Sequence, residues 1–166
     1  EASLQFASAN FQNAIAKSDD LLKSQGDSAD PRLYRLKAYS YDKLGDSIQA
    51  LANLETFFQK VKSAEDINPE NYLIAAFNAA KQKTDPAKVD YYFTKAIDAD
   101  TAADKSDAYR SMAEELKSKK DYAGAAVWYT KLIEKSDASK ITANDYYYQG
   151  FCNYAAKNYP AAISAF

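Results

Sequence analysis

The sequence contains no histidine, one cysteine, four prolines and four glycines. Without histidine, the chain has neither the commonest general base nor the commonest neutral metal ligand. A single cysteine cannot form a disulfide within the chain, so the redox compartment stays open. The sequence also has no glycine-rich phosphate loop, no cysteine pair at metal spacing and no nucleophile elbow. We therefore expect no enzyme activity, no metal site and no cofactor.

Charge and hydropathy exclude two further classes of protein. The net charge of −2 provides no basic surface for nucleic acid. No apolar run approaches the ~20 residues that a membrane helix needs, so we expect no direct membrane insertion. Hydrophobic residues make up 47% of the chain and charged residues 27%, a balance typical of a globular protein. Cys152 lies among aromatic residues without a basic neighbour, which predicts a packing thiol rather than a nucleophile.

What the sequence does contain is a repeat. A cap residue, a small residue and an aliphatic residue recur in short helical stretches, and the clearest of these runs from Lys119 to Lys135. The small position is occupied at residues 14, 50, 89, 125 and 162, which are separated by 36, 39, 36 and 37 residues. It is alanine everywhere except at Val89. A small residue at this point of an apolar helical stripe lets a neighbouring helix come close.

A second pattern recurs between these stretches. A tyrosine is followed four residues later by a small residue, which predicts another helix with one inward-facing stripe. The pairs are Tyr34 with Ala38, Tyr72 with Ala76, Tyr109 with Ala113, and Tyr146 with Gly150.

Together the two patterns resemble the tetratricopeptide repeat (TPR) family, in which an aromatic and a small residue of one helix pack against small and aromatic residues of the next. The resemblance covers nearly the whole chain, although the repeat is slightly longer than the family's and lacks its usual proline after the second helix. It implies an all-α fold, a right-handed solenoid of antiparallel helix pairs.

The predicted organisation is one array over residues 1–166. It has a partial unit at 1–29, full units at about 30–67, 68–103 and 104–139, and a partial unit at 140–166. Each of the four prolines should lie at a helix start, where its missing N–H costs nothing. The helix that opens at Asn68-Pro69 should end at about Lys83. Because no polar capping helix covers Leu4, Ile163 or Phe166, we expect a longer natural array and self-association through the terminal faces.

In the TPR family, one stripe of each first helix lines the concave wall and contacts ligands. Spacing places all three arginines of the chain on that stripe, although salt bridges to Glu70 and Asp107 would explain them equally well. The asparagine slots of the family's carboxylate clamp hold aromatic residues here, so that clamp is not expected. The resemblance implies that the partner-binding residues are Arg32, Arg35, Tyr39, Lys43, Phe77, Lys81, Arg110, Glu114, Tyr147, Phe151 and Tyr154.

The function that the resemblance implies is a non-enzymatic interaction module, which presents a concave groove to a peptide or protein partner. The alternative is a structural spacer or assembly arm of a larger bacterial envelope or secretion protein. Abundant lysine, aspartate and tyrosine with little arginine favour a bacterial source. The cytoplasm and the periplasm or cell envelope both remain open as its location.

Overall fold

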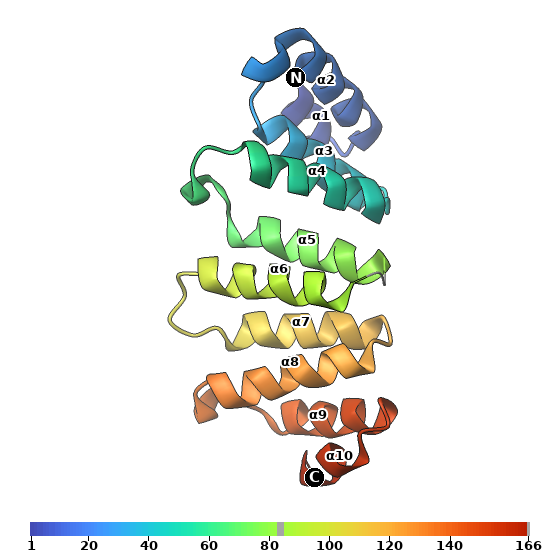
Figure 1. Cartoon of the computed structure of the whole chain (residues 1–166), viewed down its shortest axis with the longest axis vertical. Coiled ribbons are helices and arrows are strands. Elements are labelled where there is room, and N and C mark those ends of the chain that lie inside the picture. The colour runs from blue at the N-terminus through green and yellow to red at the C-terminus, as the bar shows by residue number, and fades with distance from the viewer. Residues whose placement is uncertain (83–84, 166) are drawn as a thin grey trace. The chain divides into compact units, whose positions relative to one another are not determined.

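The chain folds into two compact units of antiparallel helices, Glu1–Ala99 and Asp100–Phe166. This computed structural model describes residues 1–82 and 85–165, and within those ranges all regular structure is helical. In Figure 1 the first unit runs from blue to yellow and the second from gold to red. The fold class that the sequence predicts is confirmed.

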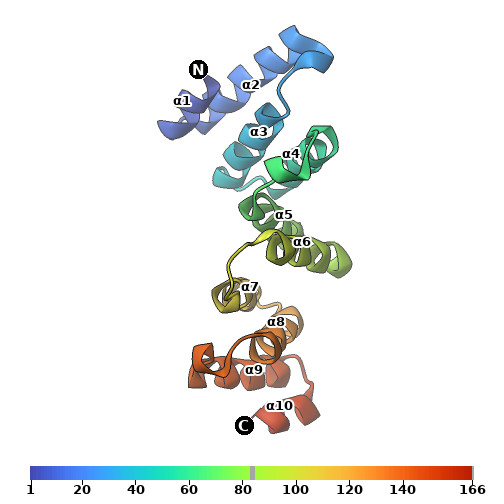
Figure 2. The same cartoon turned by 90° about the vertical axis from the view of Figure 1, so that its left-hand side faces the viewer.

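The first unit is a stack in which consecutive helices pack against one another (Figures 1 and 2). Short 3₁₀ turns at Gly26–Ser28 and Ala64–Asp66 lie in the loops between helix pairs. The loop over 61–68 contains the second of these turns. The helices are α1 (Ala2–Ala7), α2 (Phe11–Gln25), α3 (Arg32–Lys43), α4 (Ser47–Lys60), α5 (Pro69–Gln82) and α6 (Pro86–Ala99).

The second unit repeats the arrangement with four helices. These are α7 (Ser106–Ser118), α8 (Tyr122–Lys135), α9 (Ala143–Ala155) and α10 (Tyr159–Ala165), with a 3₁₀ turn at Ala138–Lys140. α8 packs against both α7 and α9, and α10 packs against α9. In both units, odd-numbered helices are the first and even-numbered helices the second of a pair. The sequence predicts that the helix now labelled α5 ends at about Lys83 and that Phe166 is exposed. Both of these residues lie outside the described ranges.

Small residues form the crossings inside each pair, as the repeat predicts. The repeated small position is the fourth residue of the second helix in each pair. It is fully buried at Ala14, Ala50 and Ala125, nearly so at Ala162, and half-buried at the larger Val89. The facing small residues of the first helices are also buried, namely Ala38, Ala76, Ala113 and Gly150. Large side chains fill the space on either side, among them Phe57, Phe93 and Tyr129.

One turn geometry joins the helices of four pairs. The residue before the second helix's cap adopts a left-handed backbone, with φ of 57° at Ala9, 81° at Gly45, 62° at Lys120 and 64° at Lys157. The next amide then bonds to the carbonyl five residues back, as in Asp121 N–H to Leu116 O at 2.9 Å. This is the Schellman ending of a helix, which glycine adopts at least cost. Only one of these four turns has glycine at that position.

In three of these turns, the residue after the left-handed position caps the next helix with its side chain. The side chains of Asn10, Asp46 and Asp121 accept the backbone N–H three residues on, at 3.4, 3.0 and 3.0 Å. In α8 that donor is Gly124, and a Cβ there would lie 2.7 Å from Asp121 Oδ2. The capping carboxylate therefore occupies the space that a side chain at this glycine would need.

Prolines mark helix starts, as the sequence predicts. Pro69 and Pro86 are the first residues of α5 and α6, Pro160 is the second of α10, and Pro31 directly precedes α3. The equivalent tyrosines differ more than the pattern predicts. Tyr109 is half-buried and its ring lies 6.1 Å from that of Trp128, whereas Tyr146 is 44% exposed. Tyr146 lies near the start of α9.

Ala125→Leu is expected to destabilise the second unit by about 1–3 kcal/mol, because the added methyl groups enter a filled crossing. Urea unfolding followed by fluorescence of Trp128, the one tryptophan and a buried residue of the same helix, measures the change. Ala123→Leu, at an exposed position of the same helix, is the control. Equal midpoints for the two variants would contradict the crossing.

Lys120→Gly is expected to stabilise the second unit by about 1 kcal/mol, because glycine adopts the left-handed backbone without strain. Lys120→Ala removes the same side chain but keeps a Cβ, so the difference between the two variants isolates the backbone effect. Urea unfolding followed by Trp128 fluorescence measures the stability of both variants. A glycine variant no more stable than the alanine variant would show that the turn is unstrained.

Candidate functional site

The predicted stripe lies on the first helices α3 and α5 of the first unit and α7 and α9 of the second. α3 and α5 contact each other, and side chains of α7 and α9 are bonded to each other as described below. We call these two surfaces the α3/α5 surface and the α7/α9 surface.

Arg32 begins the α3/α5 surface and is already paired. Its side chain bonds Asp30, with Nη2 at 2.6 Å and Nε at 2.8 Å from Oδ2. The hydrogen bonds from Arg32 hold the pKa of Asp30 below its ordinary value. Because Arg32 is exposed, the pair adds little stability and mainly fixes the start of α3.

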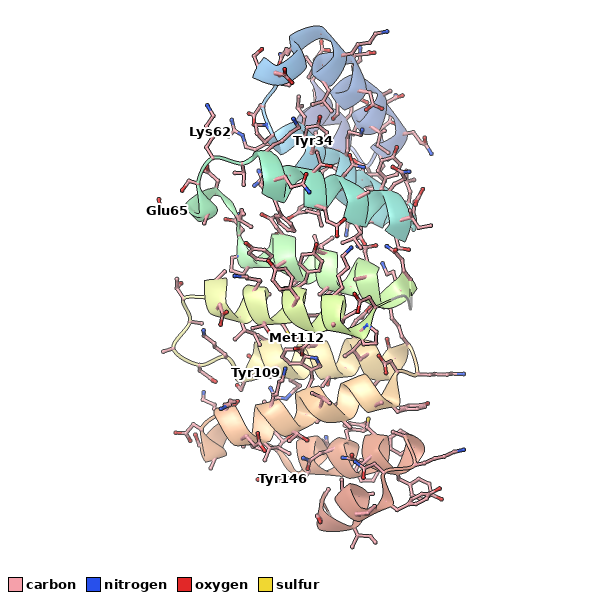
Figure 3. The ribbon with its side chains drawn as sticks, viewed as in Figure 1. Tyr34, Lys62, Glu65, Tyr109, Met112 and Tyr146 are labelled. Carbon is pink, nitrogen blue, oxygen red and sulfur yellow. The ribbon has the colours of Figure 1, made fainter. Side chains whose placement is uncertain are left out.

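Arg35, one turn further along α3, has a different environment. Its guanidinium lies over the Phe57 ring, 5.5 Å from the centroid, and no described residue forms an ion pair with it. It borders two hollows of about 540 Å³ each. The first reaches the loop after α4, where Figure 3 shows Lys62 and Glu65 projecting outward. The second is bordered by Leu36, Tyr39 and Glu70, among others.

Hydrogen bonds connect α3 to α5 along the rest of this surface. Asn71 Nδ2 donates to the Tyr39 hydroxyl at 2.6 Å, and Asn78 Nδ2 donates to Asp42 at 2.9 Å. Lys81 bonds the same Asp42 oxygen at 3.1 Å. Burial and the nearby charge of Glu70 raise the pKa of Tyr39, so its hydroxyl stays protonated at neutral pH. Tyr39 and Lys81 thus hold neighbouring helices together.

Two other predicted residues of this surface differ in exposure. Phe77 is half-buried and packs edge-on against Phe93 of α6, with ring centroids 5.4 Å apart. Lys43 ends α3, is exposed, and has no ion pair with the described residues.

Arg110 is the centre of the α7/α9 surface. Its Nε and Nη2 donate to the two oxygens of Asp145, at 2.9 and 3.1 Å. Nη1 donates to Asp107 at 2.7 Å and Nη2 also to the Lys140 carbonyl at 2.8 Å. The salt bridge to Asp107, which the sequence left as an alternative, is therefore present. Arg110 and Asp145 bind the first helices of two consecutive pairs to each other.

Asp145 is a buried carboxylate, with 3% of its side chain exposed. It also accepts the backbone N–H and the hydroxyl of Thr142, at 2.8 and 2.9 Å. Burial disfavours its charge, yet the bonds from Arg110 and Thr142 outweigh burial and lower its pKa. An ionised Asp145 and a fully bonded Arg110 therefore stabilise each other.

Aromatic side chains cover α9. Tyr147, Phe151 and Tyr154 follow one another at helical spacing and are 53%, 37% and 63% exposed. Tyr147 and Phe151 stack with centroids 6.5 Å apart, and Tyr122 meets Phe151 edge-on at 5.7 Å. These contacts hold exposed rings in fixed positions, which suits an interface.

The neighbouring positions of the α7/α9 surface are charged or buried. Lys117 Nζ lies 3.2 Å from the centroid of the Tyr148 ring, and Glu114 is exposed. Cys152 is fully buried, and burial raises its pKa to about 11, so the thiol stays protonated at neutral pH. The expectation of a packing thiol fits this environment.

Sequence reasoning missed Asn71, Asp145 and Tyr148. Asn71 and Asp145 both lie three residues after a cap, Asn68 and Thr142, and both accept that residue's backbone N–H. The Thr-x-x-Asp spacing is a form of the capping box and could have indicated this role. It could not have shown that both side chains also bind the preceding first helix.

Within residues 1–82 and 85–165, no cluster of histidine, cysteine and acidic side chains could hold a metal ion. In the same ranges, no helix is both long and apolar enough to span a membrane.

Comparison with known proteins gives matches in structure but not in sequence. No family model and no curated protein matches the chain. The fold superposes on the C-terminal part of a TPR repeat-containing protein from Cytophaga hutchinsonii, with a TM-score of 0.67 and 22% identity. That match covers 99% of this chain and 60% of the other. The MamA protein gives a TM-score of 0.67 at 17% identity, over 99% of this chain and 84% of MamA.

A third match is YrrB, described as a TPR protein with an unusual peptide-binding site. Its TM-score is 0.68 at 15% identity, over 99% of this chain and 78% of YrrB. The chain has the TPR fold. The resemblance that the repeat predicts is thus confirmed at the level of the fold, and the chain spans about 60% of the Cytophaga structure that it matches.

Arg110→Met is expected to destabilise the second unit by about 3 kcal/mol at neutral pH, because it leaves the Asp145 charge buried and unpaired. The pKa of Asp145 is lowered in the fold, so its contribution is present above the unfolded value of about 3.9 and is lost as the pH falls through the folded value. In the variant, burial without Arg110 favours the protonated form of Asp145, so the difference between variant and wild type should begin to shrink above about pH 4 as the pH falls.

Urea unfolding at several pH values, followed by Trp128 fluorescence, tests this expectation. Asp107→Asn, which removes the exposed partner of Arg110, is the control and should change stability by less than about 0.5 kcal/mol. Adding Asp145→Asn to Arg110→Met should restore part of the loss. A penalty that does not depend on pH would mean that Arg110 acts by packing alone.

Proposed function

We propose that this TPR fold is a non-enzymatic protein-interaction module that binds a peptide or protein segment on its first-helix surfaces. The exposed, ordered aromatic residues of α9 carry this proposal. Tyrosine and phenylalanine contribute a large contact area with little conformational entropy to lose, and they dominate the energetics of many interfaces. The peptide-binding site named for YrrB supports this kind of function, without identifying a ligand for this chain.

The proposed contact residues differ in their role. Tyr147, Phe151 and Tyr154 provide the apolar contact on the α7/α9 surface, and Glu114 provides an exposed charge on α7. Arg110 supports this surface through its bonds to Asp145. On the α3/α5 surface the proposed contact residues are Arg32, Arg35, Tyr39, Lys43, Phe77 and Lys81.

The α9 stripe should be required for peptide binding. Peptides selected from a random displayed library against the whole chain are expected to bind Tyr147→Ser/Tyr154→Ser at least about tenfold more weakly, a loss of ~1.4 kcal/mol. Tyr91→Ser is the matched control, because Tyr91 is 54% exposed but lies on the second helix α6. It should change affinity less than about twofold.

Isothermal titration of the selected peptides measures both variants. Binding that resists the α9 substitutions but is lost with Tyr91→Ser would place the interface on the second helices. A library that yields no binder would favour the structural spacer or assembly arm.

A further inference from the structure

Arg35 and Arg110 are equivalent residues of two repeats with different environments. Each follows the repeated tyrosine of its first helix, Tyr34 in α3 and Tyr109 in α7. Arg110 binds both carboxylate oxygens of Asp145, the third residue of the next first helix. Arg35 has no such partner among the described residues.

The counterpart of Asp145 in the next first helix after Arg35 is Asn71. Asn71 is the third residue of α5 and accepts the Asn68 N–H at 3.0 Å, as Asp145 accepts the Thr142 N–H at 2.8 Å. Both side chains are buried. An amide carries no charge, however, and its Nδ2 is bonded to the Tyr39 hydroxyl at 2.6 Å. The repeat therefore provides the guanidinium in both places but the carboxylate in only one.

The surroundings of Arg35 leave this charge available. Asp30, the nearest acid of its own helix start, is bonded to Arg32. Glu65, Asp66 and Glu70 border the hollows and are exposed, but none lies within 4 Å of the guanidinium. Arg35 itself is half-buried over Phe57, which fixes the plane of the guanidinium and removes part of its water. A fixed, partly desolvated guanidinium favours bidentate binding of a carboxylate.

We propose that the hollows beside Arg35 bind a glutamate or aspartate side chain of an acidic peptide segment. The bound carboxylate pairs with Arg35 as Asp145 pairs with Arg110, but it comes from the ligand and lies in the hollows, because Asn71 occupies the position that is equivalent to Asp145. This inference rests on the proposed function and names the ligand chemistry of the α3/α5 surface. Val61, which borders the first hollow and is half-buried, offers apolar contact to the rest of the segment.

The three arginines of the chain make a direct test feasible. A spectrum of the arginine Nε–Hε groups contains three signals, one for each residue. The Nε of Arg32 and of Arg110 already donates to a carboxylate, so those two signals should exchange slowly with water. The probe is the doubly capped peptide acetyl-Ala-Glu-Ala-Ala-Glu-Ala-amide, in which the only carboxylates are side chains. The control peptide has glutamine at both glutamate positions.

The acidic peptide is expected to shift the Arg35 signal to saturation, with a Kd of about 1 mM at low ionic strength, and to slow its exchange. The Arg32 and Arg110 signals should move much less. Arg35→Gln should weaken binding, measured on backbone amides, at least about tenfold. Lys23→Gln removes a charge of the same sign from an exposed position of α2, in the same unit, and should weaken it less than about twofold.

A third variant supplies the missing carboxylate from within the chain. Asn71→Asp is expected to slow exchange of the Arg35 signal without peptide and to weaken binding of the acidic peptide. An Arg35 signal that does not respond up to about 10 mM peptide, or that responds equally to the glutamine peptide, overturns the proposal. Equal effects of Arg35→Gln and Lys23→Gln also overturn it, because they indicate general charge attraction. The proposed function is tested by a different experiment, with the library peptides and the Tyr147→Ser/Tyr154→Ser variant. Its failure can therefore be distinguished from failure of this proposal.

Discussion

The close crossing of two helices at a small residue is the constraint on which the rest of this structure depends. At Ala125 and Ala113, and at their counterparts in the other pairs except Val89, there is no side chain beyond Cβ to hold the backbones apart. Large residues such as Phe57 and Tyr129 then pack on either side of the crossing and are themselves fully buried. Helix propensity alone would not hold helices of this length, so most of their stability comes from this packing.

The turns between the paired helices are what bring the small residues to the crossing. A left-handed residue, an Asx cap and a small fourth residue follow one another at fixed spacing from Ala9 to Ala14 and from Lys120 to Ala125. An inserted residue would rotate the second helix by about 100° and move its alanine away from the partner helix. Alanine or lysine at the left-handed position is strained, and the structure keeps that strain because turn and crossing fix the same register.

The sequence predicts the helices well because both of its signals are local. The alanine spacing and the position of proline and Asx residues at helix starts are short-range patterns, and they locate nearly every boundary. The surface is less predictable, because helical spacing shows which side chains share a face but not which of them are bonded across the fold. Arg35 and Arg110 occupy equivalent positions of the repeat. Of the two, only Arg110 is bonded to a carboxylate, that of Asp145, which lies 35 residues later in the chain.

The contrast between Asn71 and Asp145 shows how one scaffold position can change its role. A buried aspartate requires a cation, so Asp145 makes Arg110 part of the fold. A buried asparagine is uncharged and needs no cation. Asn71 forms its hydrogen bonds with the Asn68 backbone amide and the Tyr39 hydroxyl. The cap at the start of the helix is kept in both cases, because both side chains offer an oxygen to the N–H of the capping residue. An amide in place of a carboxylate at this position therefore keeps the hydrogen bond at the start of the helix but gives the preceding arginine no carboxylate partner.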